Sequence, residues 1–191
     1  RLEKLARCPL EYFMQYVLEI ESPEDNLLDP SRWLEPDEKG DLLHRVFRKF
    51  LHRLREDGLK PDAERDAERL ERILEAEISR WRDKKPCLNR EVLEAEAKEL
   101  RACASIFLFE EERFCLGREP LYFEAAAGLP PKDDGNIIDD EQAVRIPLPD
   151  GTHIHVRGYI DRIDGVPDGP HDAFTLCDYK TGSSKYYEGP D

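Results

Sequence analysis

The sequence predicts an α/β domain in which a helical layer precedes one central mixed sheet. Apolar residues recur at helical spacing through residues 1–116, and short runs typical of strands replace that pattern after Gly117. The 191 residues suffice for one packed domain and do not require two. We therefore expect a single domain over residues 1–191, mainly helical over 1–116 and mainly sheet over 117–191.

Two amphipathic helices are predicted in the first third of the chain. Residues 2–20 have apolar side chains near helical spacing, and since Pro9 fits only a first turn, we expect the helix to begin at Cys8 after a short lead-in. Residues 22–39 are polar and contain prolines, which predicts a loop. Residues 41–57 form the clearest helix, and their apolar positions make one stripe: Leu43, Val46, Phe47, Phe50, Leu51 and Leu54.

Two further helices are predicted before the sheet. Residues 62–82 contain Glu/Arg pairs at three- and four-residue spacing, which is typical of a surface helix. Asn89 is suited to cap another helix that runs to about Leu116. Neither segment has residues with an assignable chemistry, so both are interpreted as scaffold.

The predicted strands follow in the last third. Residues 121–127 form a short candidate strand. Residues 143–148 and 152–164 flank Pro149-Asp150-Gly151, which is a good turn for a hairpin. Residues 174–180 are expected to close the sheet.

Composition limits the classes of partner. The formal net charge of −14 would repel a nucleic-acid backbone, so DNA contact requires a local basic strip or a partner. No apolar run approaches the roughly 18 residues of a membrane span, so no membrane partner is expected. Five dispersed cysteines without a C-x-x-C pair favour a reducing cytoplasm. Because the chain opens at Arg1 and its one methionine is Met14, we expect a fragment truncated at both ends.

Two acidic residues and a lysine have a spacing that suits metal-dependent phosphodiester chemistry. Asp178 and Lys180 are two apart on a predicted strand, so their side chains share a face, and Asp161 ends a strand that could run alongside. Converging carboxylates can hold a hard divalent cation, and a neighbouring lysine can orient or activate a water. Surface salt bridges account for these residues about equally well, so both interpretations stay open on physical grounds alone.

Four other residues near these motifs have less specific patterns. His44 lies at the flank of the apolar stripe, where a histidine at the edge of the core is common, although imidazole can complete a mainly oxygen shell around manganese. Arg162 and Asp164 are interpreted as structural residues that turn the chain and form a salt bridge at a strand end. Cys177 alternates away from the proposed catalytic face and is expected in the core.

Four sequence blocks, taken in order, resemble the PD-(D/E)XK nucleases of the RecB/AddB type. Residues 5–13 look like the start of an AddB-like nuclease domain, the kind found in ATP-dependent helicase/nucleases, and the blocks span nearly the whole chain. The resemblance implies a restriction-endonuclease-like core with a central mixed sheet and an N-terminal or inserted helical layer. The blocks are Cys8-Pro9 with following aromatics, Gly40-x-x-x-His44, Gly158-x-x-Asp161-Arg-x-Asp164 and Asp178-Tyr-Lys180-Thr-Gly182.

The resemblance implies a site residue by residue. His44, Asp161 and Asp178 would bind Mg²⁺ or Mn²⁺, and the backbone carbonyl of Tyr179 would be a further ligand. Asp161, Asp178 and Lys180 would be the catalytic residues. Lys180 would contact the attacking water or the scissile phosphate, where its compact charge suits the developing negative charge.

Two further residues acquire a role only through the resemblance. Glu124 stands where such nucleases often have an additional acid; an exposed strand glutamate is the alternative. Cys8 would be one of four ligands of an iron–sulfur (4Fe–4S) cluster in the full-length protein, whose other three cysteines follow the nuclease motifs. Cys87, Cys103 and Cys115 lack ligand spacing, so in this stretch we expect a buried thiol at Cys8 and no cluster.

The function implied by the resemblance is metal-dependent hydrolysis of DNA phosphodiester bonds during end processing in recombinational repair. The expected partners are DNA, in the form of single-stranded ends, and a helicase subunit or fused helicase region. The family's Gln/Tyr-bearing helix would follow Asp191, so activity of this stretch on its own stays open, as does exonuclease or endonuclease mode. Two alternatives are a catalytically silent nuclease-fold module that binds DNA or a helicase, and an acidic interaction scaffold with an accidental motif match.

Overall fold

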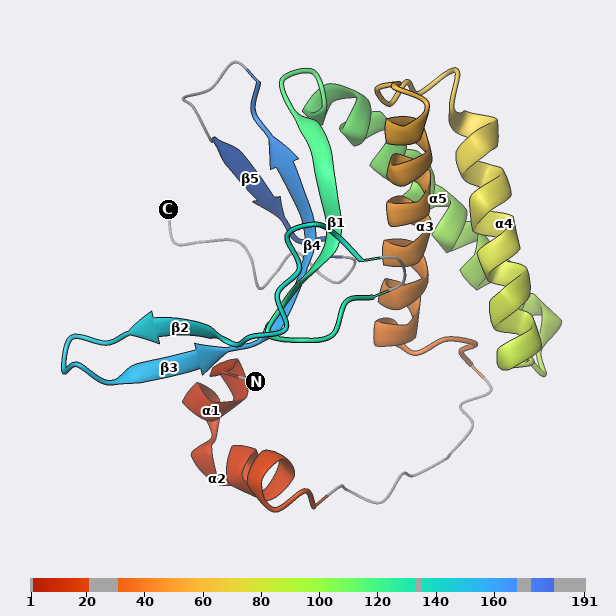
Figure 1. Ribbon diagram of the computed structural model, residues 1–191. Helices are drawn as coiled ribbons and strands as arrows, with labels where there is room; N and C mark the ends of the chain where they lie inside the picture. Colours follow the sequence, from red (N-terminus) through yellow and green to blue (C-terminus); the bar gives the residue numbers. More distant parts are fainter. Residues whose placement is uncertain (1, 21–30, 133–134, 168–172, 181–191) are drawn as a thin grey trace, which may run out of the picture.

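A layer of long helices packs beside an antiparallel sheet in the computed structural model of the chain (Figure 1). The helices precede the sheet strands in the sequence, which confirms the predicted α/β order. No helix among the described residues is both long and apolar enough to cross a membrane. The structure describes residues 2–20, 31–132, 135–167 and 173–180.

Helix α3 (Pro36–Glu56) forms the centre of the helical layer. It begins five residues before the predicted position, so the loop prediction over residues 22–39 is wrong from Pro36 onward. Pro36 fits the first helical position because its missing N–H has no intrahelical partner there. The backbone N–H of Glu35 donates to the Glu38 carboxylate at 2.8 Å, which closes a capping box that the sequence reading missed.

Helices α4 (Ala67–Lys84) and α5 (Arg90–Phe114) complete the layer. The predicted cap is confirmed: the Asn89 side chain accepts hydrogen bonds from the backbone N–H groups of Glu91 and Val92, at 2.9 and 3.4 Å. In Figure 1, α4 lies on the far side of α3 and α5 from the sheet. Both helices act as scaffold in the fold, as the sequence predicted.

The core lies between α3 and α5. Phe47 and Phe107 stack with their ring centroids 3.7 Å apart, and the Tyr179 ring meets both edge-on, at 5.5 and 5.8 Å. Full burial of each such side chain contributes about 1.5–3 kcal/mol to stability. The predicted stripe on α3 is confirmed, since all of its members are buried: Leu43, Val46, Phe47, Phe50, Leu51 and Leu54.

The central sheet has strands β1 (Glu119–Ala127), β4 (Gly158–Gly165) and β5 (Phe174–Cys177), in the order β1-β4-β5. Both strand pairs are antiparallel, and the parallel pairing described in this region is a single bridge between Ala127 and Asp140. Strand β5 ends at Cys177, three residues before the predicted end. Asp178 and Lys180 therefore follow the strand instead of lying on it.

Strands β2 (Val144–Pro147) and β3 (His153–Val156) form the predicted hairpin, which extends away from the central sheet (Figure 1). The prediction of one continuous strand over residues 152–164 is wrong. The chain leaves the hairpin at Arg157, and Gly158 then pairs with Ala127 at the start of β4. The break re-aims β4 into the central sheet, because β3 has β2 as its partner and β4 has β1.

The N-terminal segment is less regular than predicted. It consists of α1 (Leu2–Arg7), α2 (Pro9–Tyr12) and a π-helical turn (Phe13–Val17). Cys8 separates α1 from α2 with an extended backbone (φ −150°) because Pro9 occupies the first position of α2. The Cys8 side chain is half-buried, so the expectation of a buried thiol is not met in full.

Candidate metal centre

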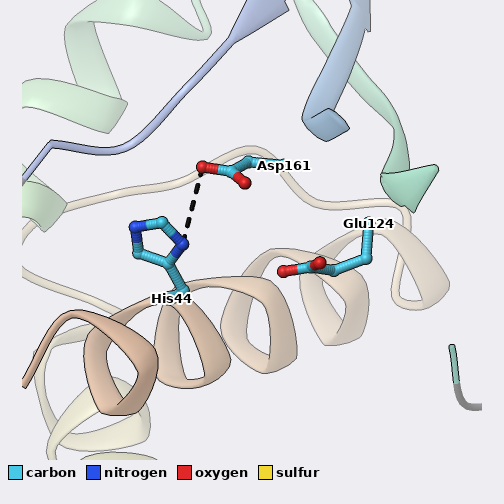
Figure 2. Close-up of side chains that lie close together, drawn as sticks. All are labelled: His44, Glu124 and Asp161. Carbon is cyan, nitrogen blue, oxygen red and sulfur yellow. Dashed lines mark ion pairs between the residues drawn. The ribbon is translucent and has the colours of Figure 1, made fainter. Parts of the chain in front are cut away.

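Three side chains from three different elements converge beside the central sheet. His44 comes from α3, Glu124 from β1 and Asp161 from β4, and Figure 2 shows the three groups pointing toward one another. One ligand atom from each lies within 4.8 Å of the other two. Two carboxylates and an imidazole are a donor set that suits Mg²⁺ or Mn²⁺.

Glu124 is brought to the site by the strand register and by an unusual backbone. Phe123 pairs with Arg162 and Ala125 with Ile160, so Glu124 lies opposite Asp161. Its φ of +51° is in the left-handed region, which costs a residue with a Cβ roughly 1–2 kcal/mol. The carboxylate is largely buried and bonds to Lys132 at 2.5 Å, which does not match the alternative of an exposed strand glutamate. Strain of this kind accumulates at functional sites.

The two ring nitrogens of His44 face two different oxygens. Nε2 lies 2.7 Å from the carbonyl oxygen of Tyr179, and Nδ1 lies 3.5 Å from Oδ2 of Asp161. If Nε2 carries the proton and donates to the carbonyl, Nδ1 presents a lone pair toward a carboxylate. A cation between Nδ1 and the carboxylate satisfies both atoms, and a backbone carbonyl is a usual second partner of a ligating histidine.

Asp161 and Asp178 have pKa values that are pushed in opposite directions. Burial raises the pKa of Asp161, against the lowering effect of the Tyr179 N–H, which donates to Oδ2 at 3.0 Å, and of His44. Burial also acts to raise the pKa of Asp178, but hydrogen bonds with Lys180 and Asp161 outweigh it, and the pKa is lowered. Such a separation is typical of neighbouring carboxyls that share one proton, whose place a divalent cation can take.

Asp178 and Lys180 lie at the exposed rim of the site. Lys180 Nζ is 2.5 Å from Asp178 Oδ2, and the two side chains are 50% and 59% exposed. The described geometry thus brings His44, Asp161 and Glu124 together, with Asp178 beside Asp161 and outside that trio. The predicted set is assembled in part, and Glu124 is closer to its centre than expected.

A polar cleft of about 420 Å³ opens over the three converging side chains. Three basic residues line it together with the acids, and the sequence reading did not assign them to the site. The signal available for two of them was their place between the apolar positions of α3. The lining residues are Asp41, His44, Arg45, Arg48, Glu124, Lys132, Tyr159 and Asp161.

Arg162 and Asp164 differ from their predicted place at a strand end. They do form an ion pair, at 2.6 Å, but both side chains are fully buried on the inner face of β4. Cys177 is half-buried, with Sγ 3.8 Å from Asp164. Sequence reasoning placed these charges outside because charged residues are rarely buried unless paired.

Comparison with known proteins gives one family and a group of relatives. The model of the PD-(D/E)XK nuclease superfamily matches residues 1–190. A protein from Geobacillus kaustophilus, named as the B-type subunit of an ATP-dependent helicase/deoxyribonuclease, is 28% identical over 194 residues, covering 96% of this chain and 15% of that protein. Proteins with the same name from Acetivibrio thermocellus and Clostridium botulinum are 25% and 27% identical, each over 97% of this chain. The chain spans about 15% of the length of the curated relatives it matches.

Proposed function

The chain belongs to the PD-(D/E)XK nuclease superfamily, and from this premise we propose that it is the nuclease domain of an AddB-like protein, a metal-dependent deoxyribonuclease. The observation that supports the proposal most directly is the convergence of His44, Glu124 and Asp161 from three elements beside the Asp178–Lys180 pair. These residues lie in the order that the family motifs require. The polar cleft above them gives a phosphodiester access.

The proposed ligands of Mg²⁺ or Mn²⁺ are His44, Asp161, Asp178 and the carbonyl oxygen of Tyr179, with Glu124 as an additional acid. A carbonyl oxygen has two lone pairs, so its contact with His44 leaves one for a cation. A divalent cation held there would polarise the phosphoryl oxygen and lower the pKa of a bound water.

The remaining residues of the cleft suit a phosphate group. Lys180 is proposed to contact the attacking water or the scissile phosphate, after it exchanges Asp178 for that partner. Arg45, Arg48 and Lys132 place positive charge around the acids, although the whole chain has a net charge of −14. They supply the local basic strip that binding to a nucleic-acid backbone requires.

The biological setting is proposed from the relatives' names. Those proteins are named as helicase/deoxyribonuclease subunits, so DNA and a helicase region are the proposed partners. We place the reaction in the cytoplasm, at single-stranded DNA ends during recombinational repair. A 4Fe–4S cluster in the full-length protein, with Cys8 as one ligand, remains part of this proposal.

A catalytically silent nuclease-fold module is the second candidate. It is favoured by one observation, the position of Asp178 and Lys180 at the exposed rim, paired with each other. A silent module would bind DNA or a helicase without cutting. It does not require an acid strained into position opposite Asp161, so we favour the enzyme.

Cleavage of end-labelled single-stranded DNA by the full-length protein, with its helicase partner, tests the proposal. We expect Mg²⁺- or Mn²⁺-dependent product, and a loss of roughly 100-fold or more in Asp178→Asn. Asp150→Asn, which makes the same change at the exposed hairpin turn, serves as the control and should cleave normally. Equal cleavage by Asp178→Asn and the unsubstituted protein would sink the assignment. DNA binding without any cleavage would favour the silent module.

A further inference from the structure

Three charged side chains lie buried behind the metal centre. Arg162 and Asp164 project from the inner face of β4 with no exposed surface, and the Glu111 side chain on α5 is 9% exposed. Arg162 donates to both oxygens of Asp164, at 2.6 and 2.7 Å, and to Glu111 at 2.9 Å. Burial costs several kcal/mol for each ion, so a buried ion cluster is weak evidence for stability alone and invites a functional reason.

Arg162 has a fourth partner, and that partner leads to the metal centre. Its Nη1 donates to the hydroxyl oxygen of Tyr179 at 2.5 Å. The backbone of the same tyrosine contacts two proposed metal ligands: its N–H donates to Asp161 at 3.0 Å, and its carbonyl oxygen lies 2.7 Å from Nε2 of His44. Tyr179 therefore joins the buried cluster to the site through one side chain and one peptide group.

The segment that contains Tyr179 has little other support from the sheet. The β4–β5 pairing ends with Arg162 opposite Cys177, so residues 178–180 lie beyond the ladder. What holds Tyr179 is the packing of its ring against Phe47 and Phe107 and the bond from Arg162 to its hydroxyl. Ring packing limits the position of the side chain, and the directed hydrogen bond fixes how far it inserts.

We propose that Arg162, held by Asp164 and Glu111, is a positioning residue of the metal centre: through the Tyr179 hydroxyl it fixes the backbone of residues 178–180, and with it the Tyr179 carbonyl and Asp178. The inference rests on the proposed function, because it concerns ligands of the metal proposed above. Arg162 does not touch the cation or the substrate in this arrangement. Its effect passes through Tyr179.

The protonation states agree with the geometry. Burial lowers the pKa of Arg162, but the bonds with Asp164, with Tyr179 and Glu111 nearby, outweigh it and raise the pKa, so the guanidinium stays charged. Burial raises the pKa of the Tyr179 hydroxyl, which stays neutral and free to accept. Hydrogen bonds from a charged donor are roughly twice as strong as bonds between neutral groups.

Tyr179→Phe is the direct test, because it removes the hydroxyl and keeps the ring and the backbone. Two properties are measured: the Mn²⁺ dissociation constant by calorimetry, and amide hydrogen exchange of residues 178–180 in metal-free protein. We expect Mn²⁺ affinity to fall by roughly 10-fold, as for other residues that orient metal ligands, and exchange to become several-fold faster. Tyr122→Phe, at a half-buried tyrosine of β1 that does not line the cleft, is the matched control and should change neither.

Glu111→Gln is the second variant, since it weakens the hold on Arg162 from the far end and leaves Tyr179 intact. It should change both properties in the same direction as Tyr179→Phe, to a smaller extent. Unchanged exchange and unchanged Mn²⁺ affinity in both variants would overturn the positioning role. Asp161→Ala separates the two proposals: if it binds Mn²⁺ as tightly as the unsubstituted protein, the metal centre is wrong, and the metal-free exchange data still decide the link from Arg162 to Tyr179.

Discussion

Glu124 lies directly opposite Asp161 in the β1–β4 pair, and it does so with a left-handed backbone (φ +51°). The strand thus maintains a strained residue at the point where its carboxylate is directed at the site. Glycine tolerates this conformation without a steric cost, whereas alanine does not. Stability and metal binding can therefore be separated at this one position.

Glu124→Gly and Glu124→Ala should differ in stability but not in metal binding. Both remove the carboxylate, so both should weaken Mn²⁺ binding to a similar extent. The glycine variant should be more stable than the alanine variant by roughly 1 kcal/mol, because only alanine keeps the backbone strain. Urea unfolding and calorimetry measure the two quantities. Equal stabilities would show that the left-handed conformation costs nothing here.

Metal removal should lower the stability of the folded chain. A ligand that binds only the native state at 100 times its dissociation constant adds about 2.7 kcal/mol, which corresponds to roughly 5–10 °C in the midpoint of thermal unfolding for a domain of this size. We expect Mn²⁺ to raise the midpoint, EDTA to reverse the rise, and Asp161→Asn to abolish it. Asp150→Asn should retain the full response. A Mn²⁺ effect that persists in Asp161→Asn would place the ion elsewhere.

Arg48→Ala should weaken DNA binding in a way that depends on salt. Arg48 lines the cleft, where it is proposed to neutralise a phosphate, and each phosphate contact to a single strand contributes about 0.7 to the slope of log affinity against log salt. The variant should bind more weakly at low salt and show a slope reduced by about that amount. Arg90→Ala removes the same charge at the start of α5, where the side chain is 89% exposed, and should leave the slope unchanged. The full-length protein and fluorescence anisotropy suit this measurement.

Cys115 should be inert to alkylation in the folded protein. Burial raises the pKa of its thiol to about 12, so it is protonated at pH 8, and only the thiolate reacts. The exposed Cys103 serves as an internal comparison on the same helix layer. Iodoacetamide at pH 8 should label Cys103 more than about 100-fold faster than Cys115, and denaturant should remove the difference. Mass spectrometry of the two peptides reads both rates in one experiment.

The sequence was sufficient for features that depend on local patterns. The stripe on α3 and the Asn89 cap follow from spacing and side-chain chemistry, and the turn at residues 149–151 follows from its composition. Ordered motifs also identified His44 and Asp161, which lie far apart in the chain and meet in the structure. Only tertiary contacts could have brought them together, so this part of the prediction came from the family resemblance and not from periodicity.

Other features depend on contacts between distant segments, which a pattern does not record. The strand break at Arg157 arises because β4 pairs with β1, and the sequence alone reads as one continuous arm. Glu124 looked like an ordinary strand residue, since its strained backbone cannot be read from neighbouring residues. The burial of Arg162 contradicted the usual exposure of charge because its partner Glu111 lies 51 positions away on α5.

The buried trio of Arg162, Asp164 and Glu111 also constrains how such a chain can evolve. Loss of one partner leaves an uncompensated charge in the interior, at a cost of roughly 3–5 kcal/mol, whereas joint replacement by apolar side chains can be nearly neutral. A typical domain has only about 5–15 kcal/mol to lose, so lineages that change these positions one at a time pass through marginal intermediates. Among homologues the three residues should therefore be retained together or exchanged together, and a sequence with only one of them altered should be rare.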